Sequence, residues 1–479
     1  MISYGIYLGG RWLETSERQQ VANPFNGDPV GEVSLASNTE MDIAAERAQD
    51  AFEIMKRMSA GERSAILKAV ATGIKERAEE FAQMITLESA KAISAARTEV
   101  QRAISTMELA SEEARRIGGD MIPMDMLPVS RFKFGISRRF PLGVVLGITP
   151  FNYPLNLPCH KIGPALAMGN SIIIKPATAT PLSMMLLAEI VEETDLPKGA
   201  FIVLPCKGSD TEYLVSNPYI KKISFTGSAE TGWRIKEIAP RKKVTLELGG
   251  NAALVIHSDS DVTEAAKKAV MGGFVYNGQV CISVQRVFIH RPVYQQALDV
   301  IIKETKQLKT GDQTDEKTFI TSMITPRDAD RVMGWISEAL GEGAEAVTGN
   351  KREGNIIFPT VLTGTKPEMK VNCMEVFGPV ITVEPYDEFE EAVAMVNGSR
   401  YGLQAGYFTK DITQIAYAYN ETEAGVVIIN DFPTFRLDHM PYGGVKDSGV
   451  GREGVKYAME EMSEPRLLVI DTLPGKNTK

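Results

Sequence analysis

In residues 40–117, apolar residues recur every three or four positions, which is the spacing of amphipathic helices. Thr39 is expected to cap a first helix, and Ser59 with Glu62 matches a capping box at the start of a second. A third helix is expected over residues 94–117, before Gly118-Gly119. The apolar face of the second helix comprises Ile66, Leu67, Val70, Ile74, Phe81 and Ile85.

From residue 143 onward, short β-branched runs alternate with helical stretches. Residues 144–148, 172–174, 201–204, 222–225 and 244–246 are predicted strands, and 184–191 is a predicted helix. The same alternation of strands and helices continues from 252 to 430, with predicted strands at 253–256, 287–289 and 426–429. Strands and helices that alternate at this spacing predict two α/β domains with doubly wound, mostly parallel sheets.

Two segments outside this alternation predict a small β arm. Residues 129–140 alternate polar and apolar around Gly135, which predicts a two-stranded hairpin with a basic exposed face, and residues 465–471 form a late apolar strand. An isolated hairpin is marginal in water and exposed strand edges need a partner. We therefore expect a homo-oligomer, either a homodimer or a dimer of dimers.

Composition excludes several classes of protein. The chain has 479 residues, 44% hydrophobic and 24% charged, with a net charge of −9, which argues against nucleic acid or an anionic membrane as a partner. No segment approaches the ~18 uninterrupted apolar residues of a membrane span, and the N-terminal residues lack a signal-peptide pattern. The four Cys and four His show no spacing for zinc or a disulfide scaffold. We expect no metal and a reducing, cytoplasmic location.

The candidate chemistry lies in two short segments, Thr245–Gly250 (TLELGG) and Asn277–Cys281 (NGQVC). The first offers the Glu247 carboxylate at the end of an apolar run, and the second offers the Cys281 thiol in a turn of small residues. A base beside a thiol is the minimum for covalent catalysis through sulfur. Taken singly, each has a plain structural alternative, a strand end for the Glu and a small buried hydrophobe for the Cys.

These segments resemble the two signature motifs of the aldehyde dehydrogenase superfamily, and other motifs follow in family order to residue 449. The resemblance implies that Cys281 is the nucleophile and Glu247 the general base. In the loop ITPFNYPLN (148–156), Asn152 would stabilise the oxyanion together with the backbone N–H of Cys281. The implied fold is α/β, with a dinucleotide-binding domain (1–120 and 141–246), a catalytic domain (247–450) and an oligomerisation arm (121–140 and 451–479).

The resemblance also places a dinucleotide. The segment FTGSAETG (225–232) follows a predicted strand and opens a helix, so its free N–H groups face an anion. Many NAD-dependent members carry Glu where Thr178 stands, and Thr does not repel a 2′-phosphate. NADP or NAD is expected, with NADP slightly favoured. The implied cofactor residues are Thr149, Pro150, Phe151, Lys175, Thr178, Gly208, Phe225, Thr226, Gly227, Ser228, Gly232, Leu248, Gly249, Glu375 and Phe377.

The substrate is the least determined part of the site. The stretch around Arg436 and His439 looks like that of lactaldehyde, sulfolactaldehyde and phosphonoacetaldehyde dehydrogenases. With Arg102 and Tyr153, these residues are candidate substrate contacts, although surface ion pairs would explain the charges equally well. Non-phosphorylating glyceraldehyde-3-phosphate dehydrogenases usually carry Arg where Val280 stands. The absence of this Arg weakens the case for a phosphate-bearing substrate.

The expected reaction is NAD(P)-dependent oxidation of a short hydroxylated or anionic aldehyde, such as lactaldehyde, to the acid through a cysteine thiohemiacetal and thioester. Two alternatives stay open. A CoA-acylating relative would pass the acyl group to CoA, and Glu247 argues against it because such members commonly lack that base. A non-enzymatic binding or structural protein has no need of Cys281, Glu247 and Asn152 together.

Overall fold

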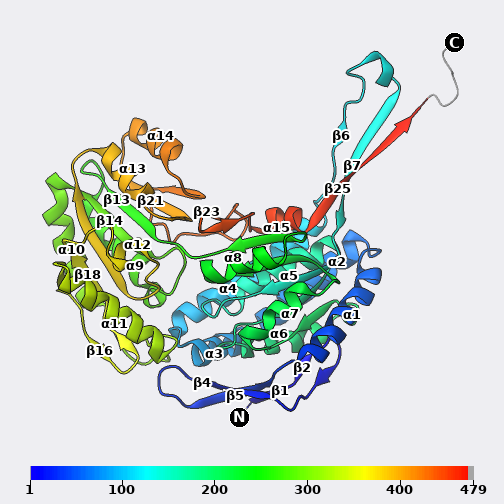
Figure 1. Ribbon diagram of the computed structural model, residues 1–479, viewed down its shortest axis with the longest axis horizontal. Helices are drawn as coiled ribbons and strands as arrows, with labels where there is room; N and C mark the ends of the chain where they lie inside the picture. Colours follow the sequence, from blue (N-terminus) through cyan, green and yellow to red (C-terminus); the bar gives the residue numbers. More distant parts are fainter. Residues whose placement is uncertain (1, 473–479) are drawn as a thin grey trace.

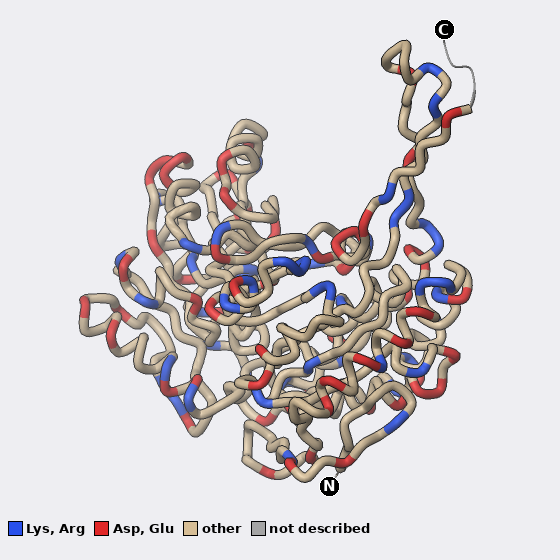
Figure 2. Tube along the Cα trace, turned by 45° about the vertical axis from the view of Figure 1, so that its right-hand side comes forward, with Lys and Arg blue, Asp and Glu red and all other residues tan. Residues whose placement is uncertain are grey.

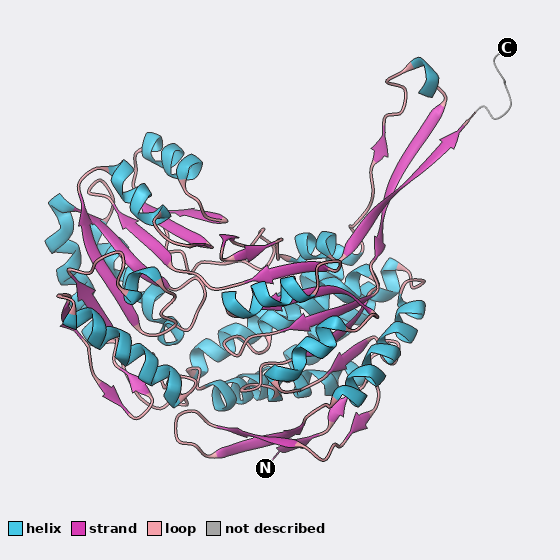
Figure 3. Cartoon of the chain, in the orientation of Figure 1, coloured by secondary structure: helices cyan, strands magenta, loops and turns pink. Residues whose placement is uncertain are grey.

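A computed structural model describes residues 2–472 of the chain. The molecule consists of two lobes, each built around one large sheet, and a thin arm that projects from the first lobe (Figures 1 and 3). Acidic and basic residues lie along both lobes (Figure 2). No helix among residues 2–472 has both the length and the apolar composition needed to cross a membrane.

The first lobe contains an eight-stranded sheet whose five central strands, β12 to β10, run parallel. Strands β8 and β9 are buried along their whole length, which is why they read in the sequence as continuous apolar runs. The sheet order is β24 (Gly449–Val450), β12 (Lys243–Glu247), β11 (Ile220–Thr226), β8 (Val144–Ile148), β9 (Ser171–Lys175), β10 (Phe201–Val203), β2 (Ile6–Tyr7) and β3 (Trp12–Leu13).

Helices cover both faces of this sheet and form a separate apolar core on each face. One face packs against α1 (Asn38–Met55), α7 (Thr211–Ser216) and α8 (Ala229–Ile238). The other packs against α2 (Ala60–Glu76), α3 (Ala78–Ser89), α4 (Ile93–Ala114), α5 (Asn156–Met168), α6 (Leu182–Glu192) and α15 (Val455–Glu461).

The N-terminal helices differ from the sequence expectation in two details. The capping box of Ser59 and Glu62 is confirmed, but Thr39 is not the first N-cap. Ser37 caps α1, because its hydroxyl accepts from the backbone of Thr39 while the Glu40 carboxylate accepts from the Ser37 N–H. The second predicted helix is two helices that break at Arg77, whose guanidinium binds Glu80 and Glu189 and fixes the junction.

The second lobe contains a seven-stranded sheet that is parallel except for β15. Each of the eight predicted strands of the chain is present, but the sequence pattern did not single out β18, β19 or β21. The order is β15 (Glu345–Thr348), β18 (Thr360–Thr363), β19 (Val380–Tyr386), β14 (Val284–His290), β13 (Ala252–Ile256), β21 (Gln404–Phe408) and β22 (Val426–Ile429). Its helices are α9 (Val262–Phe274), α10 (Tyr294–Gln307), α11 (Pro326–Gly341), α12 (Lys370–Cys373), α13 (Phe389–Asn397) and α14 (Ile412–Glu421).

The arm is a three-stranded sheet in the order β25 (Ser463–Asp471), β7 (Lys133–Pro141) and β6 (Met121–Ile122). The predicted hairpin centred on Gly135 is wrong, because β7 runs straight through that residue and pairs with a different strand on each side. Gly135 provides space instead of a turn, since a Cβ there would meet the Met124 sulfur at 2.9 Å.

The expected domain limits also need correction. Strand β24, which we assigned to the catalytic domain, pairs with β12 in the sheet of the first lobe. Helix α15, which we assigned to the arm, packs on α4 and α5, so the arm strand begins only at Ser463. The last part of the predicted arm, residues 473–479, lies outside the described residues.

The remaining strands form three small sheets at the periphery and between the lobes. They are β1 (Ile2–Tyr4), β5 (Pro29–Ser34) and β4 (Arg18–Ala22); β16 (Arg352–Glu353) and β17 (Ile356–Ile357); and β20 (Tyr401–Gly402) and β23 (Val445–Lys446).

Candidate active site

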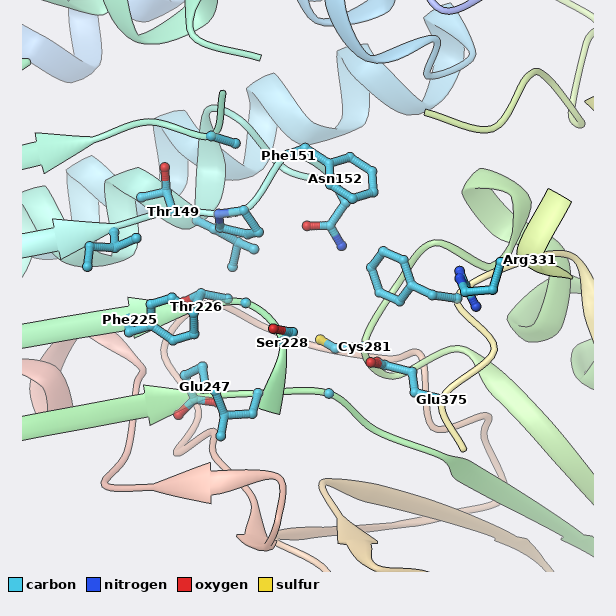
Figure 4. A pocket seen from close by; sticks show the side chains of 18 of the residues that line it. Thr149, Phe151, Asn152, Phe225, Thr226, Ser228, Glu247, Cys281, Arg331 and Glu375 are labelled. Carbon is cyan, nitrogen blue, oxygen red and sulfur yellow. The ribbon is translucent and has the colours of Figure 1, made fainter. Parts of the chain in front are cut away.

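A cavity of about 460 Å³ lies where the carboxyl ends of β8, β11 and β12 face the second lobe. Open parallel sheets bind ligands at this edge, because the strand-to-helix turns present free backbone groups there. Figure 4 shows Asn152 and Cys281 projecting into the same space. The lining residues are Ile148, Thr149, Pro150, Phe151, Asn152, Leu157, Ala177, Phe225, Thr226, Gly227, Ser228, Glu247, Leu248, Gly249, Cys281, Arg331, Trp335, Glu375 and Phe377.

The loop before Cys281 is held in an unusual backbone conformation. Tyr276 and Asn277 have φ of 48° and 57°, and Gly278 has φ of 68°. The Asn277 side chain accepts from the Thr321 N–H at 2.8 Å and donates to the Thr321 hydroxyl at 3.0 Å, which offsets the strain. The sulfur of Cys281 is therefore placed by a rigid turn.

The two segments singled out in the sequence touch each other. Gly250 lies against the carbonyl of Cys281, where a Cβ would collide with that oxygen. Its N–H donates to the Glu375 carboxylate at 2.9 Å, and the same carboxylate occupies the space that a side chain at Gly249 would fill. The two glycines after Glu247 are needed because both neighbours approach the bare backbone.

Glu247 is buried at the end of β12, and neither of its carboxyl oxygens has a hydrogen-bond partner among residues 2–472. Burial, and then the negative charge of Glu453, raises the pKa of Glu247 well above its usual range. The carboxyl group faces Gly443, where a Cβ would meet Oε1 at 2.9 Å. In Figure 4 it does not point at the Cys281 sulfur.

Cys281 is a protonated thiol in this arrangement. Burial is the largest effect and raises its pKa to about 11, although the hydrogen bond with the Tyr442 hydroxyl at 3.2 Å acts in the opposite direction. The Tyr442 hydroxyl favours the thiolate, but the effect of burial is larger. A base or a change of environment must therefore accompany attack by the sulfur.

A buried ion pair between Lys91 and Glu99 holds the backbone of the Asn152 loop in place. The Lys91 ammonium donates to the Asn152 carbonyl at 2.6 Å, and the Glu99 carboxylate accepts from the Leu155 N–H at 2.9 Å. One amide N–H of Asn152 donates to the Gln279 carbonyl at 2.8 Å. The amide is thus held beside the chain that leads to Cys281, with its second N–H available to a ligand.

The start of α8 forms one end of the cavity. Thr226, Gly227 and Ser228 line it, and the Ser228 hydroxyl caps the helix by accepting from the Thr231 N–H. The first free N–H groups of α8 point to the same region. Gly232 does not line the cavity; it is buried in α8 so that Leu248 can pack against the helix.

Lys175, Thr178 and Gly208 also lie outside this cavity, beyond Thr149, whose N–H donates to the Lys175 carbonyl at 3.2 Å. Lys175 is only 6% exposed, and burial lowers its pKa. Its only side-chain hydrogen bond among residues 2–472 is a 3.4 Å contact with the Thr178 hydroxyl. Thr178 and Gly208 are exposed.

Residues from the second lobe close the other wall. Phe377, with φ of 47°, meets Phe151 edge-on with ring centroids 5.8 Å apart. Burial raises the pKa of Glu375 to about 7. Helix α11 adds Arg331 and Trp335, which the sequence reading missed because two large side chains on an amphipathic helix look like any surface residues.

The comparisons with known proteins agree with this geometry. Residues 12–468 match the model of the aldehyde dehydrogenase family. The chain belongs to the aldehyde dehydrogenase family. It is 43% identical over 469 residues to 3-sulfolactaldehyde dehydrogenase of Priestia aryabhattai, covering 98% of each chain, and 39% identical over 472 residues to lactaldehyde dehydrogenase of Methanococcus aeolicus, covering 98% of this chain and 100% of the relative.

Among solved structures, the NADP-dependent glyceraldehyde-3-phosphate dehydrogenase from Bacillus halodurans, complexed with NADP, superposes with a TM-score of 0.96 at 36% identity, covering 99% of this chain and 100% of that one. The protein is thus an NAD(P)-dependent aldehyde dehydrogenase with the fold of that family. No group of three or more His, Cys, Asp or Glu side chains within residues 2–472 is arranged to hold a metal ion.

The residues of this aldehyde dehydrogenase fit a nicotinamide dinucleotide. The N-terminus of α8 offers N–H donors to phosphate groups. Lys175 is buried with a single long side-chain hydrogen bond, so its ammonium lacks the acceptors that a ribose or a phosphate would supply. Glu375 and Phe377 line the same cavity as Cys281.

The four expected substrate residues are not equivalent in the structure. Arg102 is 27% exposed and binds the Asp438 carboxylate through Nη2 at 2.7 Å and Nε at 3.3 Å. Tyr153 has the Lys91 ammonium 3.7 Å from its ring centroid and the Arg102 guanidinium at 6.0 Å. His439 is exposed.

Arg436 does not lie at the mouth of the site, where the sequence reading put it. Its side chain is 6% exposed, pairs with Glu453 at 3.2 Å and lies 3.6 Å from the ring centroid of Tyr442. Glu453 also pairs with Lys161 at 2.8 Å. Sequence reasoning missed Tyr442, Glu453 and Lys161. Only the fold brings α5, which carries Lys161, next to the 435–453 segment, which carries the other two.

Proposed function

We propose that this enzyme oxidises a short hydroxylated or anionic aldehyde to the carboxylic acid through a thioester on Cys281, with NADP favoured over NAD. The observation that carries the proposal is the convergence of Cys281 and the Asn152 amide on one cavity whose wall continues to the N-terminus of α8, with Glu247 at its edge. Relatives that act on 3-sulfolactaldehyde and lactaldehyde support the substrate class.

The first half of the reaction forms a carbon–sulfur bond. A base takes the Cys281 thiol proton, the sulfur attacks the aldehyde carbon, and the carbonyl π electrons move to oxygen. The free N–H of Asn152 and the backbone N–H of Cys281 stabilise the resulting oxyanion, because both are fixed before the charge develops. The nicotinamide, when bound, supplies the hydride acceptor that converts this adduct to a thioester.

The second half is hydrolysis. Glu247 takes a proton from water, the hydroxide oxygen attacks the thioester carbon, and the Cys281 sulfur leaves with the electron pair of the carbon–sulfur bond. Glu247 faces Gly443 in the structure, so its side chain must turn toward Cys281 to perform this step. A buried carboxyl group without partners is free to turn, since no hydrogen bond has to be broken.

The substrate anion is assigned to Arg102 and not to Arg436. Arg102 uses Nε and Nη2 to bind Asp438 and leaves Nη1 without a protein partner among residues 2–472. Its guanidinium lies 6.0 Å from the ring centroid of Tyr153. Arg436, by contrast, is buried beneath Tyr442 and paired with Glu453.

We expect Arg102→Ala to raise KM for an anionic short aldehyde, such as 3-sulfolactaldehyde, by about tenfold or more, and to leave KM for propanal nearly unchanged. Loss of a charge-assisted hydrogen bond removes about 1.5–3 kcal/mol of binding. Arg97→Ala on the same helix is the matched control, because that exposed arginine pairs with Glu79 and Glu316. Equal effects on both aldehydes would show that Arg102 is only structural.

Cofactor choice depends on Thr178. We expect Thr178→Glu to shift the ratio of kcat/KM from NADP toward NAD by about tenfold or more, because the new carboxylate repels a 2′-phosphate and competes for Lys175, 3.4 Å away. Thr178→Gln, of the same size but uncharged, is the control and should move the ratio far less. An unchanged ratio in both variants would place Thr178 away from the ribose.

A CoA-acylating reaction is the competing function. Assays of several aldehydes with NAD and NADP, with and without CoA, separate the two. Free acid formed at the same rate without CoA supports hydrolysis by Glu247. A strict requirement for CoA would replace this proposal with acyl transfer.

We also propose that the enzyme is a homo-oligomer, a dimer or a dimer of dimers, joined through the arm, and that it works in the cytoplasm, where its four free cysteines stay reduced. Four consecutive apolar residues of β25 (467–470) are each between 43% and 57% exposed, although they lie on both faces of the strand. An apolar edge strand of this kind needs a partner.

We expect deletion of residues 466–479 to give monomers or aggregates in light scattering. Leu468→Glu should weaken assembly in the same way, because it places a charge in the apolar strand. Ile54→Glu on α1 is the control, since Ile54 is equally exposed but lies outside the arm. An intact, active oligomer after the deletion would remove the arm from the interface.

A further inference from the structure

Tyr442 is fixed next to Cys281 more firmly than its place in a glycine-rich turn would require. Its backbone N–H donates to the Glu453 carbonyl at 3.1 Å, and its carbonyl accepts from the Glu453 N–H at 2.6 Å. The side chain is 1% exposed. The hydroxyl lies 3.2 Å from the Cys281 sulfur and has no other hydrogen-bond partner among residues 2–472.

A cation covers the ring of Tyr442. The Arg436 guanidinium lies 3.6 Å from the ring centroid and is kept there by Glu453, which also pairs with Lys161. A cation over an aromatic face stabilises negative charge on the ring system and so makes a phenol a better hydrogen-bond donor. The same Glu453 therefore anchors both the backbone of Tyr442 and the cation above it.

This hydroxyl is the only hydrogen-bond partner of the Cys281 sulfur among the described residues; either group can donate while the sulfur carries its proton, and only the hydroxyl can donate once the sulfur is a thiolate. The other neighbours form an apolar cluster that includes Tyr276, Val280, Ile282 and Leu403. The charges of Glu375 and Glu247 disfavour a negative sulfur and that of Arg436 favours it, but within residues 2–472 none of the three is hydrogen-bonded to the sulfur. A thiolate in such a setting has little stabilisation unless a polar group contacts it directly.

We propose that Tyr442 is a further catalytic residue, which donates a hydrogen bond to the Cys281 sulfur whenever the sulfur carries negative charge, and that Arg436 is the residue that positions its ring. The sulfur is negative twice in a turnover, when it attacks and when it leaves the thioester. A base takes the thiol proton of Cys281 before attack, and Tyr442 keeps its own proton in both steps. This inference rests on the proposed role of Cys281 as nucleophile.

The test is the pH profile of Cys281 alkylation by iodoacetamide in the full-length, cofactor-free enzyme, with the modified residue identified by peptide mass spectrometry. In Tyr442→Phe we expect the profile to move to higher pH, with alkylation about tenfold slower at a fixed pH, because the thiolate fraction falls. Tyr407→Phe is the matched control: it removes another buried hydroxyl, bonded to Thr422 in the second lobe, and should leave the profile in place.

Arg436→Lys tests the positioning role, because it keeps a cation but not the flat guanidinium. As a single substitution it should move the pH profile of Cys281 alkylation to higher pH. Added to Tyr442→Phe, it should cause no further shift. Should Tyr442→Phe not fold, incorporation of 3-fluorotyrosine into the wild-type chain gives a stronger donor and should move the profile to lower pH.

An unmoved profile in folded Tyr442→Phe, or in the fluorinated enzyme, would overturn the proposal, as would an equal shift in Tyr407→Phe. The alkylation measurement needs no turnover. It is therefore independent of the test of Cys281 as the nucleophile. That role is refuted only if a Cys281→Ala enzyme still oxidises aldehyde.

Discussion

Cys281→Ala should lower kcat by at least about a thousandfold while fold and NADP binding are retained, because removal of a covalent nucleophile eliminates the whole pathway. The sulfur is partly exposed to the cavity, and its only hydrogen bond within residues 2–472 is to Tyr442, so the Tyr442 hydroxyl is the one buried group that loses a partner. The measurements are steady-state rates, thermal unfolding and NADP titration by fluorescence.

Cys373→Ala is the matched control for that variant. Cys373, the last residue of α12, is also partly exposed, but its thiol donates to the Glu368 carbonyl and takes no part in the proposed chemistry. Wild-type rates are expected for it. Substantial aldehyde oxidation by a clean Cys281→Ala preparation would remove the covalent mechanism.

Glu247→Gln should separate the two halves of the reaction. We expect about one equivalent of reduced cofactor per active site in a rapid burst, followed by a steady-state rate lower by about a hundredfold or more, because the thioester accumulates without its base. The pKa of Glu247 is raised by burial and by Glu453. Its carboxylate form therefore grows as pH rises, so the wild-type steady-state rate should increase with pH in the neutral range.

Rapid-mixing absorbance at the reduced-cofactor band, with acid-trapped thioester detected by mass spectrometry, measures the burst. Glu384→Gln is a suitable control, since Glu384 is a partly buried carboxyl bonded to Thr365 in the second lobe, and it should show no burst. If Glu247 also helps to deprotonate Cys281, the burst becomes slower but keeps its amplitude. A steady-state rate equal to wild type would show that Glu247 is not the base.

Part of the fold follows from local pattern alone. Strands β8 and β9 are buried on both faces, so their sequences are short continuous apolar runs that no surface segment would carry. Ser59 and Glu62 cap their helix through contacts three residues apart, which any sequence reading can see. Strand β19, by contrast, was not predicted, because it carries Glu384 and Pro385 and its strand character depends on the neighbours β14 and β18.

The sequence by itself indicated the proposed reacting groups, since Cys281, Glu247 and Asn152 stand in short segments with a specific order. It also indicated the helix start to which we assign the cofactor phosphates, because a strand followed by a Ser-capped helix is a local signal. Only the tertiary structure decided what acts on those groups. Arg436 lies under Tyr442 and not at the mouth, and Arg331 reaches the cavity from α11, because burial and contact depend on which distant elements meet. The pKa of a thiol or a carboxyl group follows from those contacts and from burial, and neither is encoded at the position of the residue itself.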